Sequence, residues 1–188
     1  MTDLNRCSWC GGDLLYQQYH DNEWGVPCRD DKKLFEFVIL EGAQAGLSWI
    51  TVLRKRENYR KAFANFDVQK VAAFTERDVE RLMLDAGIVR NRLKITSAIS
   101  NARCFIQVQQ EFGSFSAYFW GFVDGTPIQN AFRSHTDIPA STALSDTISK
   151  DMKKRGFKFF GTTICYAHMQ ATGMVNDHVI DCYRYSQC

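Results

Sequence analysis

The chain has 188 residues, 45% of them hydrophobic and 23% charged, which predicts one globular domain and excludes a disordered or fibrous protein. A formal net charge of only +2 argues against an obvious nucleic-acid-binding protein. No segment is apolar enough to cross a membrane and no secretory signal is visible, so we expect a cytoplasmic protein with no membrane partner. In a reducing compartment, clustered cysteine and histidine indicate a metal before disulfides.

Helical periodicity dominates the chain, and strand signals are sparse. The pattern predicts helices over 32–40, 48–63, 67–74, 75–84, 91–110, the first part of 112–126, 142–154 and 162–172. Thr75, followed by Asp78, is expected to cap one of them. Residues 125–140 are predicted to be a loop. Without repeats or a convincing linker, the sequence indicates an all-α fold in a single unit, residues 1–188.

The charge is segregated along the chain. Residues 54–103 carry 12 basic and 6 acidic side chains, whereas residues 1–53 carry 4 basic and 8 acidic ones. A basic block attracts polyanions even when the whole protein is nearly neutral. For residues 54–61, however, a solvated helix face with ion pairs explains the charge equally well.

The turn after residue 84 indicates binding of a polyanion more clearly than residues 54–61 do. Gly87 is expected to adopt a positive φ and to expose backbone amides at the start of the following helix, where phosphate binds well. Residues 86–110 contain no Asp or Glu. Their cations are Arg90, Arg92, Lys94 and Arg103. We interpret residues 76–105 as a helix-hairpin-helix that holds a DNA backbone; an ordinary pair of antiparallel helices is the alternative.

Cysteine and histidine gather at both ends of the chain. His178 and Cys182 are four residues apart, so on a helix they would share a face. Cys7 and His20 complete a tetrahedral set of the kind that holds structural zinc, and Cys10 in place of His20 gives a second set. The alternative to a zinc site is that these Cys and His side chains are buried separately in the core. A redox-active Cys-x-x-Cys pair is disfavoured because no βαβ pattern surrounds it.

A carboxylate follows an apolar helix at Glu41, near a stretch rich in Tyr and Trp at 14–27. Such a group could accept hydrogen bonds from a flat cationic ligand while an indole stacks on the ligand's face. Composition alone favours the plainer interpretation, in which the aromatic side chains are core and Glu41 caps a helix.

Seven segments of the sequence together resemble one known family. They are 19–27, 40–53, 55–60, 85–88, 153–159, 161–166 and 175–178. In this order they are similar to the 3-methyladenine DNA glycosylase I family of bacterial alkylation-repair enzymes. The resemblance covers nearly the whole chain. It implies a helix-hairpin-helix glycosylase fold in which a zinc site joins residues 1–30 to residues 160–188.

The resemblance also implies roles for individual residues. It selects His20 over Cys10, so that the zinc ligands are Cys7, His20, His178 and Cys182. Glu41 and Tyr19 match polar contacts to the base, and Trp49 matches the stacking platform. Tyr16 and Trp9 match further aromatic side chains of the pocket. Gly46 and Leu47 match the segment that approaches the gap left by an extruded nucleotide.

The activity that the resemblance implies is hydrolysis of the N-glycosidic bond of N3-methyladenine in double-stranded alkylated DNA by a monomer. Residues 86–110 lack the catalytic Asp that many helix-hairpin-helix glycosylases carry. This fits a substrate whose cationic base already leaves readily, and differential binding of that base would accelerate cleavage. A zinc-stabilised DNA-binding module without catalysis is the main alternative, but it gives Glu41 no role. A zinc hydrolase would need an open metal position, which a complete Cys/His set lacks.

Overall fold

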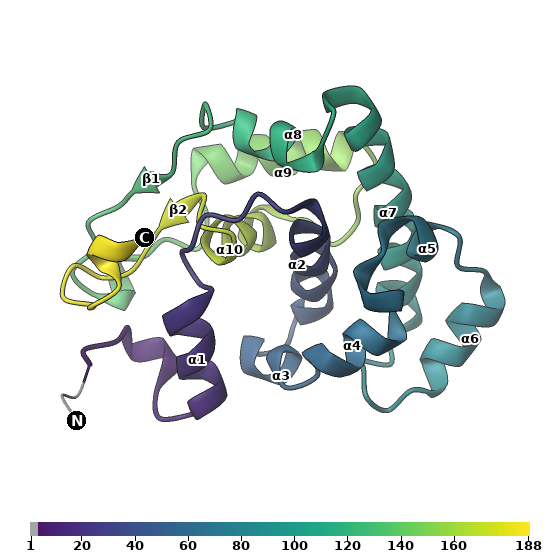
Figure 1. The fold of residues 1–188 in the computed structure, drawn as a ribbon, viewed down its shortest axis with the longest axis horizontal. Helices are drawn as coiled ribbons and strands as arrows, with labels where there is room; N and C mark the ends of the chain where they lie inside the picture. The colour runs from purple at the N-terminus through teal and green to yellow at the C-terminus, as the bar shows by residue number, and fades with distance from the viewer. Residues whose placement is uncertain (1–3) are drawn as a thin grey trace.

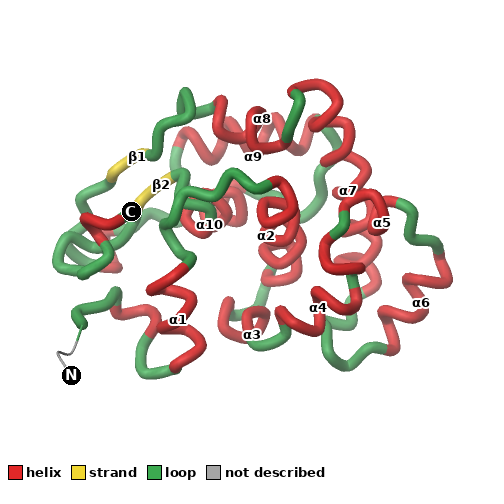
Figure 2. Tube along the Cα trace, in the orientation of Figure 1, coloured by secondary structure: helices red, strands yellow, loops and turns green. Residues whose placement is uncertain are grey.

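The computed structural model describes residues 4–188 and is built mostly of helices (Figures 1 and 2). The α-helices are α1 (Leu14–Asn22), α2 (Asp31–Gln44), α3 (Trp49–Leu53), α4 (Arg56–Ala62), α5 (Val68–Ala72), α6 (Glu76–Leu84), α7 (Arg92–Phe112), α8 (Phe115–Gly121), α9 (Ala143–Lys154) and α10 (Thr162–Ala171). Short 3-10 helices are η1 (Ser8–Cys10), η2 (Ala64–Phe66), η3 (His135–Asp137) and η4 (Tyr185–Gln187). None of the helices in this part of the chain has the length and apolar character of a membrane span.

Two short strands correct the all-α prediction. β1 (Ile128–Gln129) pairs in parallel with β2 (Val175–Asn176), with Ile128 opposite Val175. The sequence missed both strands because two residues are too few to show the alternation of a strand. The pairing ties the predicted 125–140 loop to the C-terminal segment.

Helix α2 forms the centre of the molecule and lies between α7 and α10 (Figure 1). All of its residues from 34 to 43 are buried, as expected for a helix with neighbours on every side. It starts at Asp30, whose carboxylate accepts a hydrogen bond from the backbone amide of Lys33 at 2.8 Å, which is a favourable N-cap. A fixed α2 in turn holds Glu41 in the interior.

The predicted helix over 48–63 is two helices. Around Arg54 and Lys55 the backbone amides bond to carbonyls three or four residues back, and α3 ends there before α4 begins in a new direction. No Gly or Pro marks this break, so the apolar pattern predicted one continuous helix across it. The prediction for Thr75 is confirmed: its amide donates to the Asp78 carboxylate at 2.9 Å, and α6 begins at the next residue.

The N-terminal and C-terminal segments pack against each other. Gly173, between α10 and β2, has a φ of +68°. A Cβ there would lie 2.3 Å from the backbone carbon of Val26, so only glycine allows this approach. The backbone amides of Gly25 and Cys28 donate to the carbonyls of Gln170 and Thr172. These contacts place the segment 25–28, which follows α1, beside the C-terminal end of α10.

Candidate functional site

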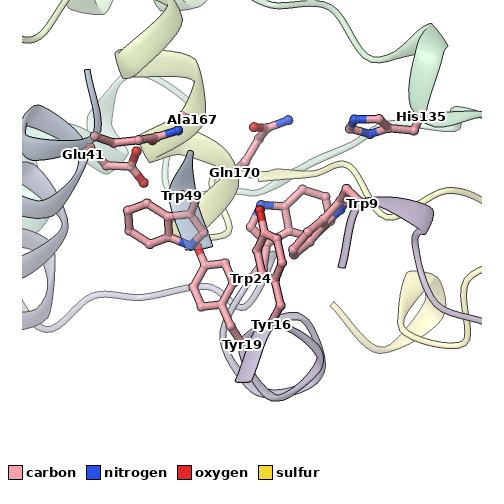
Figure 3. A pocket seen from close by; sticks show the side chains of 10 residues that line it. Trp9, Tyr16, Tyr19, Trp24, Glu41, Trp49, His135, Ala167 and Gln170 are labelled. Carbon is pink, nitrogen blue, oxygen red and sulfur yellow. The ribbon is translucent and has the colours of Figure 1, made fainter. Parts of the chain in front are cut away.

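A cavity of about 280 Å³ opens between α1, α2, α3 and α10 (Figure 3). Its walls are mainly aromatic and amide side chains. The lining residues are Trp9, Tyr16, Tyr19, Trp24, Glu41, Gln44, Trp49, His135, Ala167 and Gln170. The five residues that the sequence assigned to a pocket, Trp9, Tyr16, Tyr19, Glu41 and Trp49, all line this cavity. Size, aromatic walls and a few polar groups are typical of a small-ligand site.

Glu41 is the buried acid of this cavity. Its side chain is 2% exposed, and its Oε2 atom has no hydrogen-bond partner among the described residues. Burial disfavours the charged carboxylate and raises the pKa of Glu41 to about 8. A buried carboxyl without a partner costs stability, which is typical of a group that awaits a ligand.

Aromatic rings form the rest of the wall. The rings of Tyr19 and Trp49 lie 5.5 Å apart at a tilt of 50°, and Phe37 supports Trp49 from behind in a stacked arrangement at 6.4 Å. Trp9 meets Tyr16 edge to face at 4.8 Å. The indole Nε1 atoms of Trp9 and Trp49 are buried without acceptors among the described residues. The cavity therefore offers ring faces for stacking and N–H groups for an acceptor.

Five lining residues were not predicted: Trp24, Gln44, His135, Ala167 and Gln170. Gln44 could have been found, because it lies three residues after Glu41 and so shares its helix face. Trp24 lies within the segment 14–27 that the sequence singled out. His135, Ala167 and Gln170 reach the cavity only through the packing of the C-terminal half.

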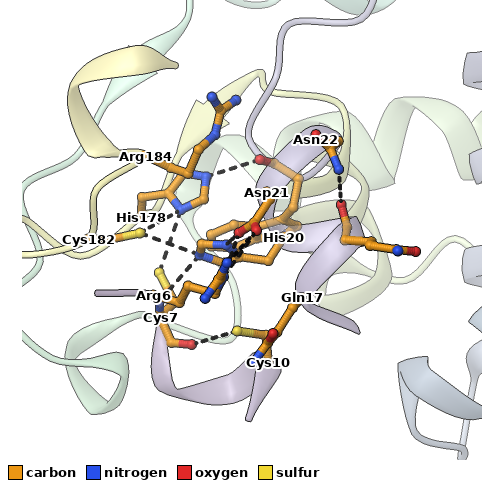
Figure 4. Close-up of polar contacts among 12 residues, drawn as sticks. Arg6, Cys7, Cys10, Gln17, His20, Asp21, Asn22, His178, Cys182 and Arg184 are labelled. Carbon is orange, nitrogen blue, oxygen red and sulfur yellow. Dashed lines mark hydrogen bonds and ion pairs between the residues drawn. The ribbon is translucent and has the colours of Figure 1, made fainter. Parts of the chain in front are cut away.

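Four buried side chains from both ends of the chain form a second cluster (Figure 4). Cys7, His20, His178 and Cys182 bring one ligand atom each to within 4.8 Å of one another. The Cys182 sulfur lies 3.4 Å from His20 Nε2 and 3.5 Å from His178 Nδ1. This donor set can hold a metal ion.

Both histidines of the cluster are oriented from outside. His20 Nδ1 lies 2.8 Å from the Asp21 carboxylate, and His178 Nε2 lies 3.0 Å from the Trp24 carbonyl. An N–H on each outer nitrogen leaves the inner nitrogen with a free lone pair, as a metal requires. The Cys10 thiol instead donates to the Cys7 carbonyl at 3.1 Å. The alternative set containing Cys10 is therefore not assembled.

The cluster is a direct neighbour of the cavity. The Trp24 ring, which lines the cavity, meets His178 edge to face at 4.7 Å. The Trp9 ring, on the same wall, lies 5.4 Å from the His20 ring. The four ligand side chains are absent from the lining, so the cluster supports the aromatic wall from behind.

Two of the three candidate DNA-binding cations already interact with other groups of the protein. Arg92 forms ion pairs with Glu76 and Glu80, and Lys94 Nζ donates to the carbonyls of Ala43 and Ala45 at 2.8 and 2.6 Å. Arg90 is exposed and makes no ion pair within residues 4–188.

The Gly87 prediction needs a correction. Its φ is not among the positive values of the described residues. Glycine is needed there for space, since a Cβ would lie 2.9 Å from the Asn58 side chain. Gly46 does have a positive φ, +79°, and Leu47 beside it is 41% exposed.

The chain is similar over nearly its whole length to known proteins of one kind. The family model for methyladenine glycosylase matches residues 9–185. The chain is 57% identical over 182 residues, 97% of each chain, to DNA-3-methyladenine glycosylase 1 of Escherichia coli (strain K12). It is 46% identical over 177 residues, 94% of this chain and 96% of the relative, to DNA-3-methyladenine glycosylase of Haemophilus influenzae. A solved Staphylococcus aureus 3-methyladenine DNA glycosylase I, described for its recognition of 3-methyladenine, superposes with a TM-score of 0.93 at 37% identity, covering 96% of both chains.

Proposed function

Because the chain belongs to the methyladenine glycosylase family, we propose that it hydrolyses the N-glycosidic bond of N3-methyladenine in alkylated double-stranded DNA. The products are the free base and an abasic site. The observation that carries this assignment is the unpartnered carboxyl of Glu41 inside an aromatic cavity. A cationic methylated base would supply both the charge and the hydrogen-bond donors that this carboxyl lacks.

Recognition begins with extrusion of the damaged nucleotide, which costs a few kcal/mol of stacking and pairing. Gly46 and Leu47, exposed on the loop after α2, are placed to enter the gap. The base then stacks on Trp49, while Glu41 and Tyr19 contact its polar edge and Tyr16 and Trp9 close the opposite wall. A cationic base favours the ionised form of Glu41.

Bond cleavage needs little further assistance. The bond between the sugar carbon and the base nitrogen breaks, and its electron pair goes to the base and neutralises the cation. Water then adds its oxygen to the electron-deficient sugar carbon and releases one proton to the solvent, which leaves the abasic site. Residues 86–110 contain no Asp or Glu whose carboxylate could take the proton of that water as a general base. Interactions that strengthen as the bond lengthens then account for the acceleration, and Glu41 is the residue best placed to make them.

The α6–α7 pair would grip the DNA as a helix-hairpin-helix spanning residues 76–105, with Gly87 in the turn. Arg90 is free to contact phosphate. Arg92 would exchange its exposed carboxylate partners for phosphate, which costs little because such pairs are weak. Lys94 is committed to the end of α2 by its two carbonyl contacts, so we assign it a structural contribution in place of a phosphate contact.

The Cys/His cluster would hold one structural zinc ion. A tetrahedron with Zn–S bonds of about 2.3 Å and Zn–N bonds of about 2.0 Å has N···S edges of about 3.5 Å. Three of the four N···S separations, those of Cys182 to His20 and of Cys182 and Cys7 to His178, are 3.4, 3.5 and 3.6 Å. Four protein ligands would leave no open position on the ion, so zinc would contribute folding energy here and no catalytic chemistry. It would join residues 1–30, of which the first three lie outside the described residues, to residues 160–188 in one monomeric unit.

The test is direct: incubate methylated duplex DNA with the protein and identify the released bases by mass spectrometry. Release of 3-methyladenine, with loss of most of that activity in Glu41→Gln, supports the assignment. Tight DNA binding without any released base would instead support the alternative, a zinc-stabilised binding module.

A further inference from the structure

Asp177 is a fully buried carboxylate held by three neutral donors. Asn130 Nδ2 donates to its Oδ1 at 2.7 Å. The Tyr166 hydroxyl and Gln170 Nε2 donate to its Oδ2 at 2.7 and 2.8 Å. No described residue forms an ion pair with Asp177. A carboxylate only accepts hydrogen bonds, so all three neighbours must present N–H or O–H to it.

The fold brings these four groups together from separate elements. Asn130 and Asp177 are the residues directly after the paired strands β1 and β2. Tyr166 and Gln170 are four residues apart on α10, so both point from one face of that helix. Of the four, only Gln170 also lines the cavity. The buried carboxylate thus reaches the cavity through one amide side chain.

Asp177 fixes which end of the Gln170 amide faces the cavity. The nitrogen is occupied by the carboxylate, and the amide orientation follows from that hydrogen bond. The oxygen is left as an acceptor at the cavity wall. Figure 3 shows this oxygen on the side of Glu41 and Trp49, with the nitrogen turned away from them.

We propose that Gln170 determines base specificity by accepting a hydrogen bond from the exocyclic amino group of the methylated adenine, and that Asp177 is its positioning residue. This rests on the proposed function. The amino group carries two hydrogens, so it can serve acceptors on two walls, Glu41 and Gln170. Guanine carries a carbonyl oxygen at the equivalent ring position. That oxygen would face the Gln170 amide oxygen, and two acceptors cannot form a hydrogen bond with each other. The locked amide therefore favours 3-methyladenine over 3-methylguanine.

Asp177→Asn tests the positioning role by a specific consequence. The new amide nitrogen takes the place of one carboxylate oxygen and must donate. Where it replaces Oδ2, the Tyr166 hydroxyl can turn to accept, but Gln170 must reverse its amide and present N–H to the cavity. The Gln170 N–H would then face the exocyclic amino group of the base, which is also a donor. We therefore expect excision of 3-methyladenine to fall by about tenfold or more. The ratio of 3-methylguanine to 3-methyladenine released from one alkylated DNA sample should rise.

The double variant Asp177→Asn, Gln170→Glu exchanges the carboxylate and the amide. The carboxylate at position 170 accepts from the new amide and again shows an acceptor to the cavity. We expect it to recover most of the lost excision and the original base ratio, a coupling that independent sites would not show. Tyr166→Phe removes another donor from the same oxygen but leaves the Gln170 hydrogen bond in place. It measures what loosening Asp177 alone does, and its base ratio should stay closer to the wild type than that of Asp177→Asn.

Gln170→Met gives a second measurement if Asp177→Asn does not fold, because it leaves Asp177 and its two other donors in place. It should lower excision of 3-methyladenine and narrow the preference over 3-methylguanine. The inference is overturned if Gln170→Met keeps wild-type excision and ratio, or if the double variant recovers nothing over a folded Asp177→Asn. A wild-type protein that releases no 3-methyladenine would contradict the proposed function itself, which is a separate outcome.

Discussion

At the scale of single residues, Glu41 combines two properties that oppose each other. It is placed in the interior by the most buried helix of the fold, yet its Oε2 has no partner among the described residues. A carboxyl kept for stability alone would have acquired a donor, because an unsatisfied buried acceptor costs about 1–3 kcal/mol. The missing partner therefore points to a ligand that brings one.

The raised pKa of Glu41 gives a pH-dependent stability. Its folded pKa, about 8, exceeds that of the unfolded chain, so the native state binds more protons between these values. The free energy of unfolding should therefore decrease as pH rises from about 4.5 towards 8. Glu41→Gln lacks this titration and should gain stability relative to the wild type by a few kcal/mol over that range. Urea unfolding of both proteins at pH 5.5 and 8.5 measures the difference; parallel pH curves would contradict the burial of an ionisable group at Glu41.

The sequence identified single residues well where they lie close to a motif. Glu41 and Trp49 lie in one recognisable segment. Residue type and spacing indicated Cys7, His178 and Cys182, and the resemblance to the family selected His20 over Cys10. Gln170 was missed because its function depends on Asp177 and on the cavity, both of which arise from tertiary packing. Lys94 was assigned to DNA from its charge alone, while the structure shows it hydrogen-bonded to the end of α2.

At the scale of elements, the α6–α7 pair carries two kinds of cationic side chain: Arg90, which is exposed, and Lys94, which is hydrogen-bonded to the end of α2. Arg90 is exposed in the turn, and replacing it with Ala should weaken DNA binding and reduce the slope of log affinity against log salt by about one unit. Lys150→Ala on α9 is the matched control, since Lys150 is also exposed. Equilibrium binding at several salt concentrations decides the matter: an unchanged slope for Arg90→Ala would remove Arg90 from the interface.

Lys94→Ala should behave differently from Arg90→Ala. It removes the donor to the Ala43 and Ala45 carbonyls at the end of the helix that carries Glu41. We expect the free energy of unfolding to fall by about 1–2 kcal/mol, as for a lost charged hydrogen bond, and base excision to fall with it. The salt slope of DNA binding should stay at the wild-type value. A reduced slope with unchanged stability would restore Lys94 as a phosphate contact.

Element boundaries show why sequence patterns are limited. The pattern predicted helix over 91–110, and α7 is close to this range because Asn91 provides a clear N-cap. Helix α1 was seen only as an aromatic and polar segment, since its apolar residues serve the cavity and not a regular core face. The break between α3 and α4 has no Gly or Pro, so no local signal in the sequence marks its position.

At the scale of the whole molecule, the Cys/His cluster links the two ends of the chain and supports the cavity wall through Trp24. Removing the metal with a chelator should therefore lower the unfolding temperature and also weaken base binding, because the aromatic wall loses its support.

Elemental analysis should find one zinc per chain in the wild type and none in Cys182→Ser. Cys10→Ser should keep the metal, since Cys10 lies outside the set. A metal-free wild type of undiminished stability would contradict the zinc assignment.

The net charge of +2 was a poor guide to function at this scale, because opposite charges lie in different parts of the chain. The basic block 54–103 contains the turn proposed to meet DNA, while the acidic block 1–53 contributes Glu41 and six other residues of the cavity lining. The sequence therefore predicted the mostly helical class and five of the ten residues that line the cavity. It did not predict the two strands that join loop 125–140 to the C-terminal segment.

The most direct test of this account is base release from alkylated duplex DNA, with the wild type and Glu41→Gln compared at equal concentration and equal folded fraction. Mass spectrometry of the released bases should find 3-methyladenine with the wild type and at least about tenfold less with Glu41→Gln, the size expected for loss of an interaction made in the transition state. Equal release of 3-methyladenine by the two proteins would contradict the central role given to this buried carboxyl.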